Sequence, residues 1–345
     1  MLAKDSRTGR TTMMRRRVVL MLFSGGAFFA SGVVANAGAV YTTFDPQGSV
    51  ATTARSISDG AVAGYYQDNQ GRYHGFVRAL DGTITGIDVS GADNTFAASI
   101  DKAGRTTGFY SESGVEHGFV RNGQGSITTF DPSGSVGTVP LSINHGAITG
   151  YYYDSNYVPH GFLRTANGSI TEFDPPGSID TNPTSINKEG AITGDYQDAN
   201  SLTHGFVRSA DGTITTFDPS GSTYTAPTSI NARGTITGLW YDSDGVNHSF
   251  LRAADGTLTT FDPAKALAST AMGINARGRI TGSYFDQNYF THGFVRTPAG
   301  KIITFDPPGS QYTTPESIDS GADNGTIVGE YADSNFIYHG FLRTP

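Results

Sequence analysis

A triplet of histidine, a small residue and phenylalanine recurs along most of this chain and limits the folds that it can adopt. The triplet begins at His74, His117, His160, His204, His248, His292 and His339, at intervals of 43 to 47 residues. A period of this size, repeated seven times, is typical of a supersecondary unit that is stacked or arranged in a ring. The repeat therefore predicts an architecture, but it says much less about activity.

One copy of the repeat reads as four short strands. In the third copy we expect strands at 140–144, 147–154, 160–164 and 169–175. The first pair is joined by Asn144-His145-Gly146 and the second pair by Asn167-Gly168. Short alternating segments with such turns are typical of antiparallel hairpins. Four strands in about 44 residues is the size of one propeller blade.

The two ends of the repeat array are incomplete in complementary ways. Residues 40–46 match the fourth strand of a unit, and residues 339–345 match the third. Joining them completes a seventh unit and removes an exposed sheet edge. We therefore predict an all-β, seven-bladed β-propeller with four antiparallel strands per blade. The N- and C-terminal strands pair to close it, and residues 38–345 form a single domain.

Residues 1–37 differ from the rest of the chain. Arg15, Arg16 and Arg17 precede an apolar run, and Ala35-Asn36-Ala37 follows it. This order is typical of a secretory signal peptide, whereas a membrane anchor would need a longer uninterrupted run. We expect a secreted protein, extracellular or periplasmic, with no membrane insertion after cleavage.

The charge balance and the absence of cysteine exclude several kinds of function. Residues 38–345 carry 17 Lys and Arg against 30 Asp and Glu. Such a surface repels phosphate backbones, so we expect no nucleic-acid partner. The chain has no cysteine, which excludes disulfides, thiol catalysis and cysteine-ligated metals.

These motifs resemble those of the bacterial extracellular HAF-repeat proteins, which are named after a His-Ala-Phe triplet. The middle residue here is Gly in six copies and Ser249 in the fifth. The preceding Gly-x-Ile-x-Gly, as in residues 190–194, also fits that pattern, and the similarity covers about residues 40–345. The resemblance implies a secreted repeat protein with a propeller-like β fold, and it supplies no reaction, ligand or catalytic residue.

An acidic residue precedes each histidine by five or six positions. An oriented general base needs one such pair, whereas this chain has seven, so we interpret the pairs as structural braces. A charge-assisted bond of this kind contributes roughly 1.5–3 kcal/mol. The predicted braces are Asp68–His74, Asp154–His160, Asp198–His204, Asp242–His248, Asp286–His292 and Asp333–His339, with Glu112 before His117 as the variant.

Two further motifs are interpreted as scaffold. A Ser-Ile pair, as in Ser142-Ile143, recurs in the first strand of most units, and we expect these pairs to line a central channel. A Phe-Asp-Pro motif, as in Phe173-Asp174-Pro175, recurs in the outer strand. There Phe packs inward, and Pro ends a strand where no donor is needed.

The loops after the second strand are the candidate binding surface. They combine aromatic residues with Asp and Asn, which suits stacking on sugar rings and hydrogen bonding to hydroxyls, although polar hairpin loops are common in any case. The candidate ligand-binding residues are Tyr153, Asn156, Tyr157, Asn200, Tyr241, Asp244, Asn288, Tyr289 and Asn335.

No cofactor is expected. Calcium is the one metal for which these loops resemble a binding site. Asp242-Ser243-Asp244-Gly245 has alternating oxygen donors. It lacks the later bidentate acid of a complete calcium loop, so the motif is incomplete.

Three functional interpretations remain open. The first is a non-enzymatic binding or scaffold module, with a glycan or another surface protein as partner and no catalytic residues. The second is an enzyme of the propeller lactonase or lyase kind, with its site at the channel mouth. The third is a purely structural cell-surface repeat.

Overall fold

The computed structural model describes residues 38–321 and 325–345, and these contain 28 strands and no helix. The predicted signal peptide lies in residues 1–37, outside the described residues, so its cleavage stays a prediction. No helix in the described ranges is long and apolar enough to cross a membrane.

The strands group into four-stranded antiparallel units. The first three units are β2 (Ser49–Ser58), β3 (Ala61–Asp68), β4 (Tyr73–Arg78) and β5 (Ile84–Ile87); β6 (Asn94–Ile100), β7 (Thr106–Glu112), β8 (Val115–Arg121) and β9 (Ile127–Phe130); and β10 (Gly137–Asn144), β11 (Ala147–Tyr153), β12 (Pro159–Arg164) and β13 (Ile170–Phe173). The fourth and fifth are β14 (Ser178–Ile186), β15 (Ile192–Asp198), β16 (Thr203–Arg208) and β17 (Ile214–Phe217); and β18 (Tyr224–Ile230), β19 (Ile236–Tyr241), β20 (Asn247–Arg252) and β21 (Leu258–Phe261). The sixth is β22 (Ala268–Ile274), β23 (Ile280–Phe285), β24 (Thr291–Arg296) and β25 (Ile302–Phe305), and the last is β26 (Tyr312–Ile318), β27 (Ile327–Ala332) and β28 (Tyr338–Thr344) with β1 (Val40–Phe44).

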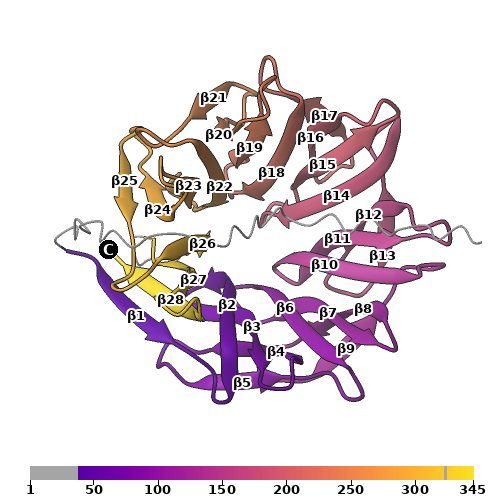
Figure 1. Ribbon diagram of the computed structural model, residues 1–345. Helices are drawn as coiled ribbons and strands as arrows, with labels where there is room; N and C mark the ends of the chain where they lie inside the picture. The colour runs from indigo at the N-terminus through magenta and orange to yellow at the C-terminus, as the bar shows by residue number, and fades with distance from the viewer. Residues whose placement is uncertain (1–37, 322–324) are drawn as a thin grey trace, which may run out of the picture. The chain divides into compact units, whose positions relative to one another are not determined.

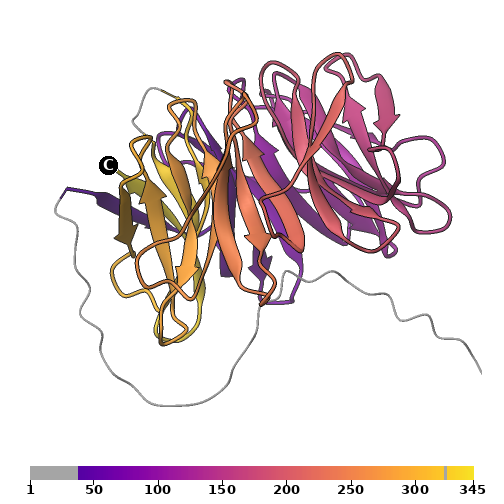
Figure 2. The same cartoon turned by 90° about the horizontal axis from the view of Figure 1, so that it is seen from above.

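The prediction of an all-β fold built from four-stranded antiparallel units is confirmed. In the third unit, β10, β11, β12 and β13 lie where the repeat predicts its four strands. The fourth and fifth units are joined into one eight-stranded sheet by a single parallel pair, Thr203 with Tyr224. Because the strands alternate in direction, the tight turns lie at one end of each unit and the longer loops at the other (Figure 2).

Strands from the two ends of the described chain lie side by side (Figure 1). β1 pairs antiparallel with β28, from Val40 opposite Thr344 to Phe44 opposite Gly340. His339 Nδ1 in β28 lies 2.7 Å from Asp45 Oδ2, just after β1. The first strand of each unit contacts the first strand of the next, and β26 and β27 contact β2.

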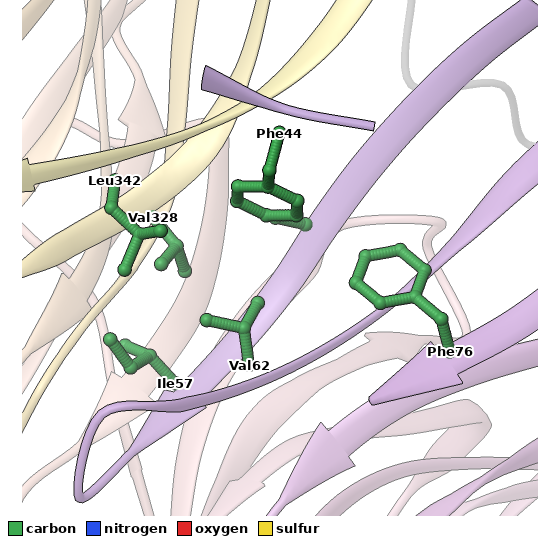
Figure 3. Close-up of a cluster of buried hydrophobic side chains, with 7 residues drawn as sticks. Phe44, Ile57, Val62, Phe76, Val328 and Leu342 are labelled. Carbon is green, nitrogen blue, oxygen red and sulfur yellow. The ribbon is translucent and has the colours of Figure 1, made fainter. Parts of the chain in front are cut away.

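The core is repeated at each boundary between units. The phenylalanine of every triplet is fully buried, and Phe206 packs against Phe173 of the preceding unit with ring centroids 6.1 Å apart. Arg208, two residues later, lies over the same Phe173 ring at 5.0 Å. At the first boundary, Phe44 and Leu342 pack with Val62 and Phe76 (Figure 3). The repeated Phe-Asp-Pro and His-Gly-Phe motifs therefore join neighbouring units.

A β-bulge in the first strand of each unit explains why the second strand has a glycine at the same position in all seven units. The register between β14 and β15 shifts between Pro183 and Ser185, which leaves Thr184 as the extra residue. The shift brings the Asn182 carbonyl oxygen to 2.3 Å from where a Cβ on Gly194 would lie. Only glycine fits opposite the bulge.

The Ser-Ile pairs have a different role from the one expected. Ile143 and Ile186 are 3% exposed and belong to the core. The Ser142 hydroxyl accepts a hydrogen bond of 3.2 Å from the Ile186 backbone N–H in the next unit. These pairs therefore connect units, because the bulge turns the serine toward its neighbour and the isoleucine into the core.

Candidate functional site

Each triplet histidine contacts a carboxylate that the sequence interpretation did not pair with it. The Nδ1 atom of His160 lies 2.7 Å from Asp174 Oδ2, and the same bond recurs in all seven units at 2.7–3.0 Å. Asp174 belongs to the Phe-Asp-Pro motif of the same unit. The sequence did not reveal this pair, because the two residues are fourteen positions apart and come close only when the third and fourth strands align.

The predicted brace partners lie on the other side of the imidazole at more varied distances. Nε2 of His74 lies 3.1 Å from Asp68 Oδ2, and Nε2 of His248 lies 3.3 Å from Asp242 Oδ2. The corresponding distances for Asp154, Asp198, Asp286 and Asp333 are 3.6–3.9 Å. Only the first two have hydrogen-bond length. Whether the pairs act as braces stays a prediction.

The predicted brace aspartates mainly hold the loops that follow them. Asp154 Oδ1 accepts backbone N–H bonds of 2.8 Å from both Asn156 and Val158. These donors, the Val158 N–H most strongly, hold the pKa of Asp154 below its usual range, although partial desolvation opposes them. This Asx turn fixes the loop from Asp154 to Val158.

Two carboxylates around one imidazole favour its charged form. The hydrogen bond to Asp306 raises the pKa of His292, and the charges of Asp306 and Asp286 add to it against a smaller effect of burial. Burial has the largest single effect on His74 and would lower its pKa. The hydrogen bonds and charges of Asp68 and Asp88 together outweigh it, so the pKa of His74 is raised.

Three of the long loops present an aromatic residue in a left-handed backbone conformation. Tyr157, Tyr289 and Phe336 have φ values of 62°, 63° and 61°. Their side chains are 62%, 75% and 64% exposed. The same loop position is Gly71 in the first unit and Gly245 in the fifth. A bulky residue in this conformation is uncommon and is characteristic of functional positions, so these loops differ from ordinary turns.

The predicted ligand-binding residues fall into two groups. Tyr157 and Tyr289 are exposed, as are Asn156, Asn200, Asp244, Asn288 and Asn335. Tyr153 and Tyr241 are half-buried, because Tyr153 packs on Tyr151 and Tyr241 packs on Tyr224, with centroids 5.5 and 5.0 Å apart.

Phe336 is a surface aromatic that the sequence interpretation missed. It lies beside Tyr312, with ring centroids 6.0 Å apart, and Tyr312 also lies beside Phe290. Alignment of its loop with those of Tyr157 and Tyr289 could have identified it. Phe290, Tyr312 and Phe336 thus form an aromatic strip across the sixth and last units.

A second candidate site lies between the first and last units. Arg55 Nη1 donates a 2.7 Å hydrogen bond to Glu316 Oε2, and the Thr53 hydroxyl donates a 2.5 Å bond to Glu330 Oε2. Arg55 and Glu316 are the extra residues of the bulges in β2 and β26. We call Thr53, Arg55, Glu316 and Glu330 the seam cluster. Its side chains come from β2, β26 and β27.

Burial and neighbouring charges both shift pKa values in the seam cluster. Burial, then the neighbouring Glu316, raise the pKa of Glu330 to about 7, although Thr53 and Arg55 oppose the shift. The Glu316 carboxylate raises the pKa of Arg55, which therefore stays charged. The Glu316 side chain is 8% exposed, whereas that of Arg55 is 39% exposed. Water therefore reaches the Arg55 end of the cluster.

Arg55 and Glu316 of the seam cluster are exceptions to the repeat. The bulge position holds Arg55 in the first unit and Glu316 in the last, and elsewhere it holds Ala98, Leu141, Thr184, Thr228 and Met272. The sequence interpretation missed this site, because Arg55 and Glu316 are 261 positions apart. Comparing the copies at the residue before each conserved serine would have found it.

A metal site is not evident in the described part of the chain. Residues 38–321 and 325–345 contain no group of three or more His, Cys, Asp or Glu side chains arranged to hold a metal ion. In the incomplete calcium motif, Asp242 Oδ1 instead accepts N–H bonds of 2.9 Å from Asp244 and Val246.

Comparisons with known proteins give structural similarity without a family assignment. No family model matches the sequence. No curated protein sequence matches it either. Virginiamycin B lyase from Staphylococcus aureus has a similar structure, with 16% identity and a TM-score of 0.58 over 89% of this chain and 99% of the lyase. The β-propeller domain of the Trilobed protease from Pyrococcus furiosus gives 11% identity and a TM-score of 0.61, over 85% of this chain and 95% of that domain.

A lectin is also among the similar structures. The BP39L lectin from Burkholderia pseudomallei is 12% identical, with a TM-score of 0.50 over 76% of this chain and 87% of the lectin. At such identities the likeness shows the fold alone. The chain has a β-propeller fold built from repeats.

Proposed function

We propose that the units form a closed ring of seven blades. The pairing of β1 with β28 and the contacts of β26 and β27 with β2 support this, as they are the contacts that closure requires. Asp319 in the last unit accepts N–H bonds of 3.1 Å from Asp59 and 2.9 Å from Gly60 in the first. The same kind of link joins the second and third units, where the Gly146 N–H donates to Asp101 Oδ2 at 3.0 Å.

The propeller acts as a secreted binding module that uses its long loops. The observation that carries this proposal is the placement of Tyr157, Tyr289 and Phe336 at a left-handed loop position. An L-residue there is disfavoured by about 1–2 kcal/mol, and folding gains little from a side chain that stays in water. The exposed aromatic faces are therefore explained better by a ligand than by the fold.

A carbohydrate is the ligand class that these loops suit best. Sugar rings present apolar faces that stack on aromatic rings and hydroxyls that hydrogen-bond to side-chain amides. Asn288 and Asn335 are exposed next to Tyr289 and Phe336. Their Nδ2 atoms lie 3.4 Å from Asp286 and Asp333, which sets the orientation of each amide before a ligand arrives.

A glycan array probed with residues 38–345 tests this function. We expect binding to a limited set of glycans, and a loss of about tenfold or more in affinity in the double variant Tyr289→Ala/Phe336→Ala. Leu80→Ala is the matched control, since Leu80 is 72% exposed and lies in a turn at the other end of its unit. Equal losses in both variants, or no glycan bound, would contradict the proposal.

The array also separates the other interpretations. Binding that a chelator abolishes would indicate calcium in the Asp loops. Capture of a surface protein with no glycan bound would favour a protein partner. Release of a modified glycan from the array would favour an enzyme.

A further inference from the structure

The seam cluster is not explained by the requirements of the fold. Five other units fill the bulge position with uncharged residues and form the same contacts between neighbours. Replacing a buried ion pair by apolar residues is often neutral or stabilising, so the folded state gains little from Arg55 and Glu316. Buried ionisable groups that the fold does not require are characteristic of functional sites.

The charges of the seam cluster do not cancel. Arg55 is compensated by Glu316, to which its Nη1 donates at 2.7 Å. Glu330 receives a hydroxyl hydrogen bond from Thr53, which carries no charge. One guanidinium and two carboxylates therefore leave one negative charge when both carboxylates are ionised.

Among residues 38–321 and 325–345, the groups that act on the pKa of Glu330 include no cation besides Arg55. Its charge interacts with Glu316 in β26 and Tyr338 in β28 on its own unit, and with Arg55 in β2 and Tyr65 in β3 across the boundary. Burial raises the pKa of both Tyr65 and Tyr338 from 10, so both phenols stay neutral near pH 7. An anionic ligand would be repelled by two carboxylates, and a neutral one would leave the ionised form of Glu330 uncompensated.

We propose that the seam cluster binds a primary alkylammonium group, with Glu330 as its counter-ion. The ligand carries this group either on a free polyamine or on a lysine side chain. The ammonium would donate to the Glu330 carboxylate in a charge-assisted hydrogen bond. The excess of 30 acidic over 17 basic residues in 38–345 favours the approach of such a ligand. The site uses other residues than the loop aromatics and does not depend on glycan binding.

Calorimetric titration with spermidine tests the proposal. At pH 8 we expect saturable binding that is absent with triacetylspermidine, which keeps the chain and loses the charges. From pH 8 to pH 6, Kd should increase about tenfold, because protonation of Glu330 competes with the ammonium. Binding at pH 6 should therefore release protons, which titrations in two buffers of different ionisation enthalpy detect.

Two isosteric variants locate the site. Glu330→Gln should abolish spermidine binding, whereas Glu189→Gln, which removes a 61% exposed carboxylate in a tight turn, should leave it unchanged. If both variants bind spermidine more weakly by the same factor, the binding comes from overall surface charge, and the proposal is overturned. Binding without proton release at pH 6 would also overturn it, and this measurement on the unmodified protein does not require the variant to fold.

A blocked lysine tetrapeptide in place of spermidine distinguishes the two sources of the ammonium. If the peptide binds more tightly than spermidine and Glu330→Gln abolishes that binding, the ammonium comes from a lysine side chain. Tighter binding of spermidine assigns a free polyamine. Failure of both probes at pH 8 would overturn the proposal.

Discussion

At the scale of single residues, the repeat makes each exception informative. Ser249 replaces the glycine of the triplet and is fully buried. Its hydroxyl lies 2.6 Å from that of Ser269, which in turn donates a 2.6 Å bond to Asp262. Thr225 and Thr313 are the residues at the position of Ser269 in the neighbouring units. The smaller serine leaves room for the extra hydroxyl, so the two exceptions compensate each other.

The imidazole–carboxylate pairs predict a stability difference that depends on pH. Asp306→Asn should destabilise the fold by about 1.5–3 kcal/mol at pH 6, since it removes a charge-assisted bond of 2.8 Å to His292. The pKa of His292 is raised, so its contribution is fully present below the unfolded value near 6.5 and is lost as pH rises through the folded value. Urea unfolding should therefore show a smaller loss at pH 9. The same loss at both values would contradict a charged imidazole.

Glu330 predicts a pH dependence of stability opposite to that of an ordinary acidic group, whose folded pKa is lowered. Its folded pKa of about 7 lies above the ordinary 4.5, so its ionisation destabilises the folded state as pH rises through this range. The full effect is on the order of 3 kcal/mol. Calorimetry should show that Glu330→Gln raises Tm relative to the unmodified protein at pH 8.5 and changes it little at pH 4.5. A variant that is less stable at pH 8.5 would show that the charged form is favoured.

At the scale of elements, the bulge of the first strand determines what the second strand can contain. It places a carbonyl oxygen where a side chain would begin, so each unit has a glycine there. The bulge also leaves one residue per unit outside the ladder, half-buried and free to vary. Both charged members of this set, Arg55 and Glu316, belong to the seam cluster.

Alanine at Gly194 should therefore disrupt its unit. The new Cβ would lie 2.3 Å from the Asn182 carbonyl oxygen, and the bulge cannot retreat without breaking the bond between Ser142 and Ile186. We expect a loss of roughly 3 kcal/mol or more in the free energy of unfolding. Gly86→Ala is the control, because no atom lies within 4 Å of its added Cβ. Thermal unfolding that is equal in the two variants would refute the steric argument.

At the scale of the whole described chain, the two ends share one unit. Phe44 from β1 and Leu342 from β28 are both 8% exposed and pack with residues of the first unit. Stability therefore depends on contacts between residues almost 300 positions apart. Closing contacts at such a separation costs more chain entropy than closing local ones, which slows folding.

Deleting residues 38–46 tests the proposed closure. The deletion removes Phe44 and exposes the edge of β28, so we expect a loss of at least 3–5 kcal/mol and a tendency to associate through that edge. A synthetic peptide of residues 38–46 should restore Tm and the monomer, as judged by calorimetry and light scattering. An unchanged Tm after deletion would show that β1 is dispensable and that the ring does not depend on it.

The sequence by itself determined the unit, its four strands and the all-β class, because turn residues and alternation act over a few positions and recur in every copy. It also identified the loops that carry Tyr157 and Tyr289. Only the tertiary structure paired His160 with Asp174, buried the isoleucines of the Ser-Ile pairs, and brought Arg55 next to Glu316. These last two residues are 261 positions apart. Their contact depends on how the first and last units meet, which a local pattern cannot encode.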